Sequence, residues 1–380
     1  MMRACHVMAK PVSSRCNLRC RYCFYLEKPR QMPMDEATLE AFIRQHIAAQ
    51  SGPVVEFAWQ GGEPTLAGLA FYRKAVALQQ HYRAGKRIQN TLQTNGILLD
   101  EAWCRFLKTH DFLVGLSLDG PQAVHDVYRR TRSGKPSHHR VMDALARLKD
   151  HQVEFNLLTV VGQHNVQEPE TLYTYLSHLG TPFLQFIPLL ERDASGAVTP
   201  ESVTPAQFGR FLNRVFDHWV RRDIGRIFVQ LFDSTLGVWC GHPAQMCAFS
   251  ETCGHALALE ANGDVYACDH YVYPAYRLGN IHGTSIDTLN QGAEAIRFGE
   301  NKKRLLVQAC RDCPVLNLCH GDCPKHRLHQ GKSYFCRSYH DFFTHSAPCM
   351  KIMRNLLASH RSPSELMEIL AVRTTGGHDG

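Results

Sequence analysis

The segment Cys16-Asn17-Leu18-Arg19-Cys20-Arg21-Tyr22-Cys23-Phe24-Tyr25 places three cysteines within eight residues near the start of the sequence. Three thiolates at this spacing suit a loop wrapped around a metal cluster. Four thiolates would close a four-iron cluster, whereas three leave one iron without a protein ligand, and a small molecule can coordinate that iron. The segment therefore predicts a reactive iron–sulfur cluster with one open iron.

A zinc loop is the alternative interpretation of this segment. Structural zinc takes four ligands, usually in paired Cys-x-x-Cys or Cys/His groups. The nearest further cysteine, Cys5, lies eleven residues before Cys16. The spacing therefore favours a cluster over a single zinc ion.

The composition is that of an ordinary globular protein, with 380 residues, of which 44% are hydrophobic and 20% charged. The formal net charge of +7 is modest and its basic residues are dispersed, so general nucleic-acid binding is not indicated. No signal peptide and no membrane-spanning run is recognisable, and we expect a cytoplasmic protein. Because that compartment keeps thiols reduced, the fifteen cysteines indicate metal binding rather than disulfides.

Residues 35–190 alternate short apolar runs with helical patterns. Strands are expected at 5–11, 54–59, 88–94, 112–118, 154–161 and 183–188, and helices near 35–50, 68–84, 100–109, 137–150 and 168–179. This alternation is typical of parallel βα units. Six units are too few for an eightfold barrel, so the fold class predicted is α/β, a partial (β/α)6 barrel. An amphipathic helix over 206–222, with an apolar stripe expected to face the core, follows.

Conspicuous motifs follow three of these strands, at the edge where parallel sheets carry their sites. They are Gln60-Gly61-Gly62-Glu63-Pro64, Asn95-Gly96 and Ser117-Leu118-Asp119-Gly120-Pro121. Paired glycines let a backbone approach a ligand closely. Plain strand-to-helix turns are the alternative interpretation of each motif.

A second cysteine array occupies the C-terminal half. Its members are Cys247, Cys253, Cys268, Cys310, Cys313, Cys319, Cys323 and Cys336. A hairpin of strands 256–260 and 264–268, joined through Asn262-Gly263, precedes Cys268. Eight thiolates suffice for two complete four-cysteine clusters, and two zinc knuckles are the alternative.

The first cysteine segment, with Tyr22 before its third cysteine and Phe24-Tyr25 after it, resembles the cluster loop of radical S-adenosylmethionine (SAM) enzymes. The resemblance implies that SAM chelates the open iron and is cleaved reductively to a 5′-deoxyadenosyl radical. It also implies that Gly61, Gly62 and Glu63 hold the SAM amino group, and that Ser117 and Asp119 contact its ribose and methionine parts. Further contacts to SAM or substrate are expected from Tyr25, Gln60, Gln93 and Arg129, although Tyr25 is alternatively a packing residue and Arg129 a solvated surface charge.

The second array is similar to the SPASM extension of radical SAM enzymes that modify peptides and proteins. By this resemblance Cys247, Cys253, Cys268 and Cys323 hold a first auxiliary cluster, and Cys310, Cys313, Cys319 and Cys336 a second. Cys349 is the alternative to Cys336. With Cys16, Cys20 and Cys23, the chain would carry three 4Fe–4S clusters.

The whole combination is most similar to the anaerobic sulfatase-maturating enzymes, through Trp-Gln-Gly-Gly-Glu-Pro-Thr-Leu, Leu-Gln-Thr-Asn-Gly, Ser-Leu-Asp-Gly-Pro and Cys-Asp-His. This family implies oxidation of a cysteine or serine in an unfolded or nascent sulfatase polypeptide to Cα-formylglycine. The radical would remove the Cβ hydrogen, Asp269 would act as the general base, and the auxiliary clusters would accept the electron. An electron donor such as flavodoxin or ferredoxin is expected as a partner. No binding to nucleic acid or to a membrane is expected.

The expected domains are a radical SAM partial barrel over 1–230, a SPASM domain over 231–350, and a C-terminal helix with a disordered tail over 351–380. The tail is expected from Thr374 onward. A SPASM maturase that forms thioether or carbon–carbon crosslinks is the alternative within the same chemistry. A non-enzymatic zinc-binding adaptor is the alternative from another class.

Overall fold

The computed structural model describes residues 5–28, 31–254 and 256–375, which form two compact units. The first unit contains the residues up to Leu118, His125–Asn156 and Thr252–Asn301. The second contains Asp119–Val124, Leu157–Glu251 and the residues from Lys302 onward. Both units therefore combine part of the predicted barrel with part of the cysteine-rich half.

The first unit is built on parallel strands that pair in chain order. They are β1 (His6–Ala9), β2 (Val54–Trp59), β3 (Arg87–Thr94) and β4 (Phe112–Ser117). The register aligns Trp59 with Ala9 on one side and Leu92 on the other. The carboxyl ends of these strands therefore meet at one edge of the sheet, where the sequence motifs lie.

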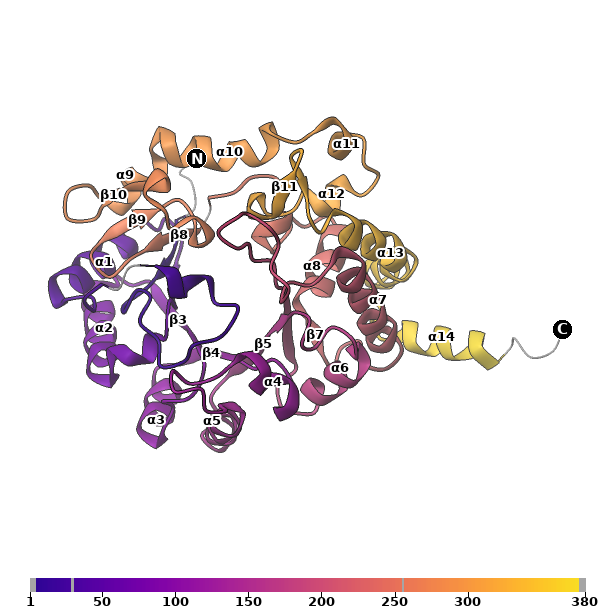
Figure 1. The fold of residues 1–380 in the computed structure, drawn as a ribbon, viewed down its shortest axis with the longest axis horizontal. Helices are drawn as coiled ribbons and strands as arrows, with labels where there is room; N and C mark the ends of the chain where they lie inside the picture. The colour runs from indigo at the N-terminus through magenta and orange to yellow at the C-terminus, as the bar shows by residue number, and fades with distance from the viewer. Residues whose placement is uncertain (1–4, 29–30, 255, 376–380) are drawn as a thin grey trace. The chain divides into compact units, whose positions relative to one another are not determined.

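Helices cover one face of these strands, as Figure 1 shows for α1, α2 and α3. The helices are α1 (Glu36–Ala48), α2 (Leu69–Tyr82), α3 (Glu101–Thr109), α4 (Gln122–Tyr128) and α5 (His138–Asp150). Asp35 and Asp100 accept hydrogen bonds from the first-turn amides of Thr38 and Trp103, and so cap α1 and α3. Buried Phe42 contacts Trp59 edge to face, which anchors α1 to the sheet.

The cysteine-rich half extends the sheet of the first unit. Strand β8 (Ala256–Leu259) pairs in parallel with β1, and β9 (Asp264–Tyr266) and β10 (Arg277–Asn280) follow antiparallel. The β8–β9 turn contains Gly263 at a φ of +86°, a conformation that favours glycine. Helices α9 (Ile286–Gln291) and α10 (Ala293–Arg304) come next in the chain. The pairing of β1 with β8 brings the start of the chain beside the segment that precedes Cys268.

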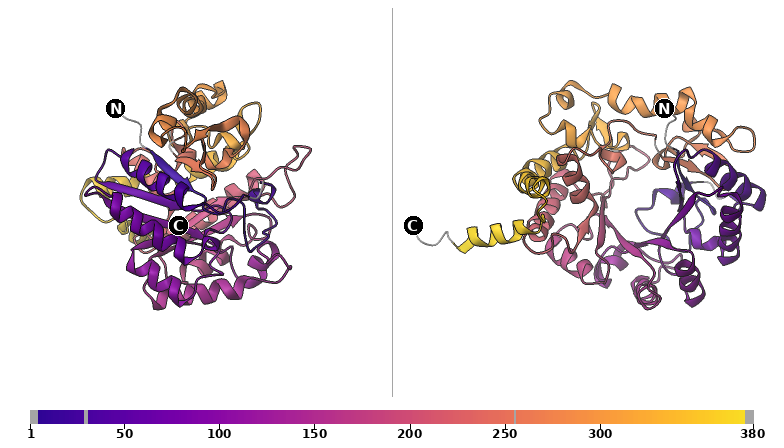
Figure 2. Two further views of the ribbon diagram at one scale, coloured as in Figure 1. Left: turned by 90° about the vertical axis from the view of Figure 1, so that its left-hand side faces the viewer. Right: turned by 180° about the vertical axis from the view of Figure 1, so that it is seen from behind.

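The second unit contains the remaining parallel strands, β5 (Phe155–Val161), β6 (Phe183–Pro188) and β7 (Phe228–Val229). Its helices are α6 (Pro169–Ser177), α7 (Pro205–Arg222), α8 (Gln230–Trp239), α11 (Gln308–Arg311), α12 (Leu316–Cys319), α13 (Cys336–Ala358) and α14 (Glu365–Thr375). A small hairpin, β11 (Arg327–His329) and β12 (Lys332–Ser333), precedes α13. Figure 2 shows α14 projecting from the rest of this unit.

The apolar stripe of α7 packs against α13. Phe208 contacts Phe335 at a ring distance of 5.4 Å, and Phe216 contacts Phe342 at 5.9 Å. A Cβ atom on Gly209 would lie 3.1 Å from the Cα atom of Ser338, so a small residue is needed where these helices cross. The prediction that this stripe forms core is confirmed, because its residues are buried.

Short 3-10 helices connect these elements: η1 (Phe24–Glu27), η2 (Pro64–Ala67), η3 (Cys247–Phe249), η4 (Asp269–Tyr271), η5 (Pro274–Tyr276) and η6 (Pro324–His326). Within the described ranges, no helix is long and apolar enough to cross a membrane.

The predicted fold class, a partial (β/α)6 barrel with a cysteine-rich SPASM extension, is confirmed by the order of these elements. The predicted strands at 54–59 and 183–188 coincide with β2 and β6. Helices α4, α8 and α9 to α12 were not predicted. The predicted disordered tail begins too early, because Thr374 and Thr375 belong to α14; residues 376–380 lie outside the described residues.

Candidate active site

The loop that contains Cys16, Cys20 and Cys23 is held on one side by the Gly-Gly-Glu-Pro turn. The amide of Gly62 donates to the carbonyl of Ser13 at 2.7 Å, and the amide of Glu63 donates to that of Arg15 at 2.8 Å. A Cβ atom on Gly62 would lie 2.1 Å from the Arg15 carbonyl oxygen. In this structure Gly62 is therefore required for close contact between two backbone segments.

The residues after α4 hold the other side of the cysteine loop. The amides of Arg19 and Arg21 donate to the carbonyls of Arg130 (2.8 Å) and Tyr128 (3.0 Å). The Arg129 side chain lies over the Tyr22 ring at 5.6 Å, and the residue is 7% exposed. Arg129 is thus not the solvated surface charge that was one interpretation of it.

The Cys16 thiol lies among several of the predicted site residues. The amide of Leu18 approaches its sulfur at 3.4 Å and the Asn95 side-chain nitrogen at 3.8 Å. Burial raises the pKa of Cys16 to about 12; the negative charges of Glu63 and Cys23 also raise it, whereas the Leu18 amide and Arg129 lower it. Such a buried thiol needs a cation to become a thiolate, which fits a metal-cluster ligand.

Cys20 and Cys23 complete this loop. The amide of Cys23 donates to the carbonyl of Cys20 at 3.1 Å, which closes a tight turn. Cys23 also packs against the buried cluster formed by Tyr25, Ala258, Tyr266 and Val272. The third cysteine is therefore positioned partly by the hairpin of the cysteine-rich half.

Glu63 is 1% exposed and joins the Gly-Gly-Glu-Pro turn to the end of β3. Its Oε1 accepts hydrogen bonds from the Thr65 hydroxyl (2.6 Å) and the Thr94 hydroxyl (2.7 Å), and its Oε2 accepts one from the Asn95 amide (2.8 Å). Burial raises the pKa of Glu63 in spite of these hydrogen bonds, which lower it. The carboxylate thus has a clear structural function beside its predicted contact to SAM.

The other predicted SAM contacts lie at the ends of strands. In the first unit, the Gln93 side-chain nitrogen donates to the Ser117 hydroxyl at 3.0 Å. Asp119 belongs to the second unit, where it is fully buried, accepts a hydrogen bond from the Val160 amide at 3.1 Å and pairs with His164 at 3.5 Å. Gln93 and Ser117 are therefore in contact with each other. Asp119 instead contacts Val160 of β5, within the second unit.

Asp269 forms an ion pair with Lys10, at the carboxyl end of β1. Lys10 is buried and its ammonium lies 4.4 Å from the centre of the Tyr25 ring. The Tyr25 hydroxyl donates to Glu260 Oε1 at 2.6 Å, and the Ser13 hydroxyl donates to Glu260 Oε2. This Lys10 cluster, defined as Lys10, Ser13, Tyr25, Glu260 and Asp269, connects the cysteine loop to the residue after Cys268.

The charge on Lys10 decides the ionisation of Asp269. Burial alone raises the pKa of Asp269, but attraction to Lys10 and His270 and hydrogen bonds from Lys10 and Gln60 outweigh it, so the net shift is downward. Asp269 is therefore ionised and able to accept a proton. Its side chain is 18% exposed, whereas that of Lys10 is 1% exposed, so the carboxylate is reachable from one side.

The four cysteines predicted to bind the second auxiliary cluster line one pocket of about 30 Å³ in the second unit: Cys310, Cys313, Cys319 and Cys336. Cys349 lies thirteen residues beyond Cys336 in the same helix, α13. At 1.5 Å per residue this separates the two cysteines by about 20 Å. The geometry thus favours Cys336 over Cys349.

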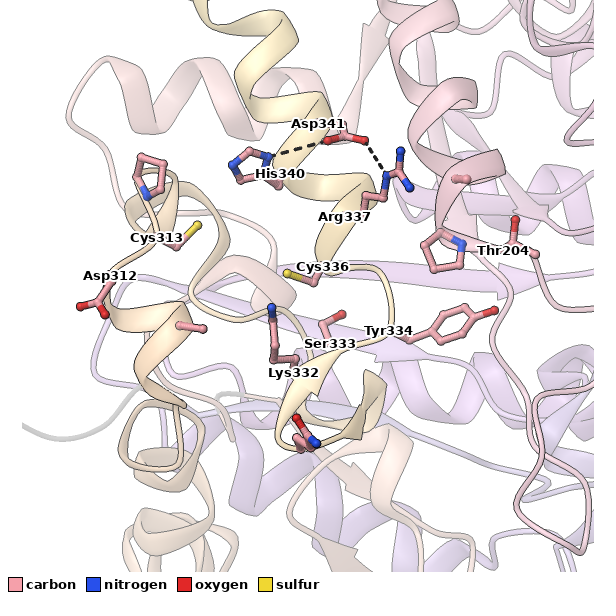
Figure 3. Close-up of a pocket in the computed structure, with 15 residues that line it drawn as sticks. Thr204, Asp312, Cys313, Lys332, Ser333, Tyr334, Cys336, Arg337, His340 and Asp341 are labelled. Atoms are coloured by element: carbon pink, nitrogen blue, oxygen red, sulfur yellow. Dashed lines mark ion pairs between the residues drawn. The ribbon is translucent and has the colours of Figure 1, made fainter.

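A larger pocket of about 940 Å³ adjoins this cysteine pocket. Figure 3 shows Cys313 and Cys336 on facing sides of it, with Lys332 and Tyr334 from the β11–β12 hairpin and the following residues. Asp341 pairs with Arg337 at 3.5 Å and with His340 at 3.7 Å along α13. Two of the predicted cluster ligands, Cys313 and Cys336, therefore border this larger cavity.

The cysteines predicted for the first auxiliary cluster are divided between the units. Cys253 and Cys268 belong to the first, and Cys247 and Cys323 to the second. In the second unit the buried Lys302 ammonium donates to the carbonyl of Cys247 at 2.9 Å and to that of Ala248 at 2.7 Å. These two carbonyls provide the buried ammonium with hydrogen-bond acceptors and fix the backbone at Cys247.

Zinc sites were the alternative interpretation of the cysteine groups. Over residues 5–28, 31–254 and 256–375, no three Cys, His, Asp or Glu side chains converge as ligands of a single metal ion.

Sequence reasoning did not select two residues that the structure places at the site, Lys10 and Glu260, and it named Asn95 only within a strand-end motif, without a role. Lys10 directly follows β1, so the rule that selected Gln60 also applies to it. Glu260 ends the first hairpin strand and had no such signal, because its partners Ser13 and Tyr25 are more than 230 residues away.

Comparison with known proteins agrees with this site. The family described as "Radical SAM superfamily" matches residues 11–176, and the family described as "Iron-sulfur cluster-binding domain" matches residues 247–314. The serine-type anaerobic sulfatase-maturating enzyme of Bacteroides thetaiotaomicron is 40% identical, over 96% of this chain and 95% of its own. The cysteine-type enzyme of Clostridium perfringens is 35% identical, over 90% and 96%.

Solved structures show the same relation. Native anSMEcpe with bound AdoMet and the Cp18Cys peptide has a TM-score of 0.86 at 33% identity, covering 93% of this chain and 99% of that chain. SuiB from Streptococcus suis, at 13% identity and a TM-score of 0.63, shares the fold. Because the similarity extends over nearly the whole chain, the protein belongs to the anaerobic sulfatase-maturating enzymes, which are radical SAM enzymes that bind SAM and iron–sulfur clusters.

Proposed function

We propose that this enzyme oxidises a cysteine or serine of a sulfatase polypeptide, unfolded or nascent, to Cα-formylglycine. Support comes from relatives of both the serine type and the cysteine type. The observation that carries the proposal is the Lys10 cluster, in which an ionised Asp269 lies beside the predicted ligand Cys268 and is linked through Tyr25 to the cysteine loop. An oxidation needs such a proton acceptor close to an electron acceptor.

The chemistry requires the loss of a hydrogen atom, a proton and an electron from the target residue. When bound, SAM would supply the 5′-deoxyadenosyl radical needed to remove the Cβ hydrogen atom, and the clusters would supply electron transfer. Asp269 accepts the proton of the target thiol or hydroxyl. A serine then becomes the aldehyde directly, whereas a cysteine becomes a thioaldehyde, which exchanges sulfur for the oxygen of water and releases sulfide.

Lys10 and Gln60 are proposed to prepare Asp269 for this step. The ammonium holds the carboxylate in its ionised form, and Gln60 adds a hydrogen bond to the same group. The acceptor is thereby oriented before the substrate arrives, which is how a positioned general base contributes to the rate.

The proposed ligand sets follow the sequence assignment. Cys16, Cys20 and Cys23 hold the SAM-binding cluster; Cys247, Cys253, Cys268 and Cys323 hold the first auxiliary cluster; and Cys310, Cys313, Cys319 and Cys336 hold the second. SAM is contacted by Tyr25, Gln60, Gly61, Gly62, Glu63, Gln93, Ser117, Asp119 and Arg129. This makes three 4Fe–4S clusters in all.

The proposal also includes the domain boundaries and the cellular setting. A radical SAM barrel over 1–230 is followed by a SPASM domain over 231–350 and a C-terminal helix over 351–380. An external donor such as flavodoxin or ferredoxin reduces the SAM-binding cluster. A cytoplasmic location agrees with this chemistry, because thiolate ligands stay reduced there.

The test is anaerobic incubation of the iron-reconstituted enzyme with SAM, a reductant and peptides that carry Cys-x-Pro-x-Arg or Ser-x-Pro-x-Arg. Mass spectrometry should show conversion to formylglycine together with 5′-deoxyadenosine, and the preferred peptide identifies the substrate type. If 5′-deoxyadenosine forms and neither peptide changes, the sulfatase assignment is wrong, and a crosslinking peptide maturase becomes the better interpretation.

A further inference from the structure

Three consecutive left-handed residues follow Cys319. His320, Gly321 and Asp322 have φ angles of +44°, +72° and +56°. Two of these are not glycine, and L-residues adopt this region only at an energetic cost. Such a turn therefore needs a compensating interaction, and here it surrounds a predicted cluster ligand.

The turn is closed by a backbone hydrogen bond, in which the amide of Asp322 donates to the carbonyl of Cys319 at 2.9 Å. The turn thus fixes Asp322 three residues after the predicted ligand Cys319.

The same turn buries the carboxylate of Asp322, which is 0% exposed. Its Oδ2 accepts hydrogen bonds from the Ser333 hydroxyl at 2.7 Å and from His326 Nδ1 at 2.8 Å. The Ser333 hydroxyl is the donor to this carboxylate, and His326 forms an ion pair with it when the imidazole is protonated. Its Oδ1 is also buried, and it has no hydrogen bond of normal geometry to any described residue.

This carboxylate lies close to the cysteine pocket. Ser333, which holds Asp322, lines the pocket together with Cys319 and Cys336. Asp322 is therefore tied to this pocket twice, through the chain by its position three residues after Cys319 and through its hydrogen bond with Ser333.

We propose that Asp322 sets the reduction potential of the auxiliary cluster held by Cys310, Cys313, Cys319 and Cys336. A fixed negative charge in a dry environment opposes the addition of an electron, so it lowers the potential of this cluster. A low potential makes the reduced cluster a good donor, and the electron taken from the substrate passes on to an oxidised flavodoxin- or ferredoxin-type carrier. This role rests on the ligand set in the proposed function.

The test is an anaerobic redox titration of the reconstituted enzyme, followed by electron paramagnetic resonance. Asp322→Asn keeps the shape of the side chain and removes its charge. We expect the equilibrium constant for reduction of one auxiliary cluster to rise by at least tenfold. For a one-electron couple this is a rise of about 59 mV in its reduction potential. The SAM-binding cluster, recognised by the response of its signal to SAM, should not shift. An unchanged auxiliary potential contradicts the proposal.

A second variant predicts a change of the opposite sign. Ser333→Ala removes a donor that partly compensates the carboxylate, so the auxiliary potential should fall. If Asp322→Asn does not fold, the Ser333→Ala variant tests the proposal by itself. An auxiliary potential that rises or stays unchanged in Ser333→Ala contradicts the proposal. Asp223→Asn is the matched control: Asp223 is buried, and it is held by Tyr173 at 2.6 Å and by Arg226 instead of by a turn at a ligand cysteine.

Failure of the ligand assignment is distinguishable from failure of this proposal. Cys319→Ser should remove one cluster, measured as iron content and as the loss of one signal. If the iron content is unchanged, the assignment is wrong. If the cluster is lost in Cys319→Ser and its potential is unmoved in Asp322→Asn, only the role of Asp322 is wrong.

Discussion

Lys10 combines features that lysine seldom has in a folded protein. It is 1% exposed, it pairs with Asp269, and its ammonium lies over the ring of Tyr25. Burying an ammonium is costly unless a carboxylate or an aromatic face compensates it, and both are present here. The pair therefore depends on both partners, and removing either one leaves an uncompensated charge.

At this scale we predict that Lys10→Met uncouples the reaction. Asp269 loses its orienting partner, so formylglycine should fall about 10- to 100-fold, the range seen when a supporting residue of a site is removed. Formation of 5′-deoxyadenosine should continue. The ratio of formylglycine to 5′-deoxyadenosine measures the uncoupling. Lys10→Arg keeps the charge and should therefore restore part of the formylglycine yield. Equal loss of both products in Lys10→Met would indicate a structural role alone.

Asp269→Asn removes the proposed base itself. The amide cannot accept the proton of the target residue, and a general base typically contributes about 10²- to 10⁴-fold. SAM cleavage should therefore persist while most aldehyde formation is lost, as read by mass spectrometry of the peptide. An undiminished yield of formylglycine would remove Asp269 from the mechanism.

At the scale of elements, the cysteine loop depends on two backbone contacts. The Gly-Gly-Glu-Pro turn supports it from one side and residues 128–132 from the other. The turn itself is joined to β3 through Glu63. The loop is therefore held by backbone contacts on both sides, and changes in the supporting elements should appear as defects in cluster binding.

Gly62→Ala should prevent assembly of the SAM-binding cluster. The added methyl would lie 2.1 Å from the Arg15 carbonyl, which is backbone and cannot move aside cheaply. Iron content after reconstitution should fall by about four irons per chain. Gly52→Ala, at a position with no atom within 4 Å of the added methyl, is the control. Full iron content in Gly62→Ala would contradict the importance of this contact.

Helix α8 provides a prediction about pH. Burial raises the pKa of Asp233 to about 7, whereas an unfolded aspartate has a pKa of about 3.9. Between these values the folded state keeps a proton that the unfolded state loses, so the free energy of unfolding falls as pH rises from about 4 to 7. Asp233→Asn has no titrating group at this position, so it should not show this fall in the free energy of unfolding.

The variant should therefore unfold at a higher temperature than the parent at pH 8, and the difference should shrink toward pH 4. Circular dichroism under anaerobic conditions measures both. Exposed Asp150→Asn is the control for the change in net charge. A constant difference across this range would show that the titration of Asp233 does not affect stability.

At the scale of the whole molecule, the contact units do not follow chain order. The hairpin strand β8 joins the sheet of the first unit beside β1, while α13 packs on α7 in the second. Truncation at residue 230 would therefore remove elements from both units, whereas truncation at residue 350 would remove residues of the second unit alone. The cysteine-rich half thus contributes to the structure of both units.

The second auxiliary cluster allows a test at this scale. Cys336→Ser should reduce the iron content by about four irons per chain, because Cys336 lines the pocket with three other ligands. Cys349→Ser should leave the iron content unchanged. If iron is instead lost in Cys349→Ser and kept in Cys336→Ser, Cys349 is the fourth ligand of this cluster.

Most of the fold was predictable from sequence because its signals are local. The positions of strands β2 and β6 and of the apolar stripe of α7 follow from short patterns of apolar and polar residues in the sequence. Helices α11 and α12 are too short for such a pattern, and α13 contains Pro348, which obscured its length. The cysteine groups were equally readable, since the spacing of ligands within one loop is set by the chain itself.

What the sequence determined by itself is therefore local: the cysteine loops, the strand-end motifs and the order of the βα units. Only the tertiary structure decided which distant residues meet. Lys10 and Asp269 are 259 residues apart, and Tyr25 and Glu260 are 235 apart. A strand's pattern reveals which of its faces is buried but not which strand lies beside it. The pairing of β1 with β8, on which the Lys10 cluster depends, had to be seen in the folded chain.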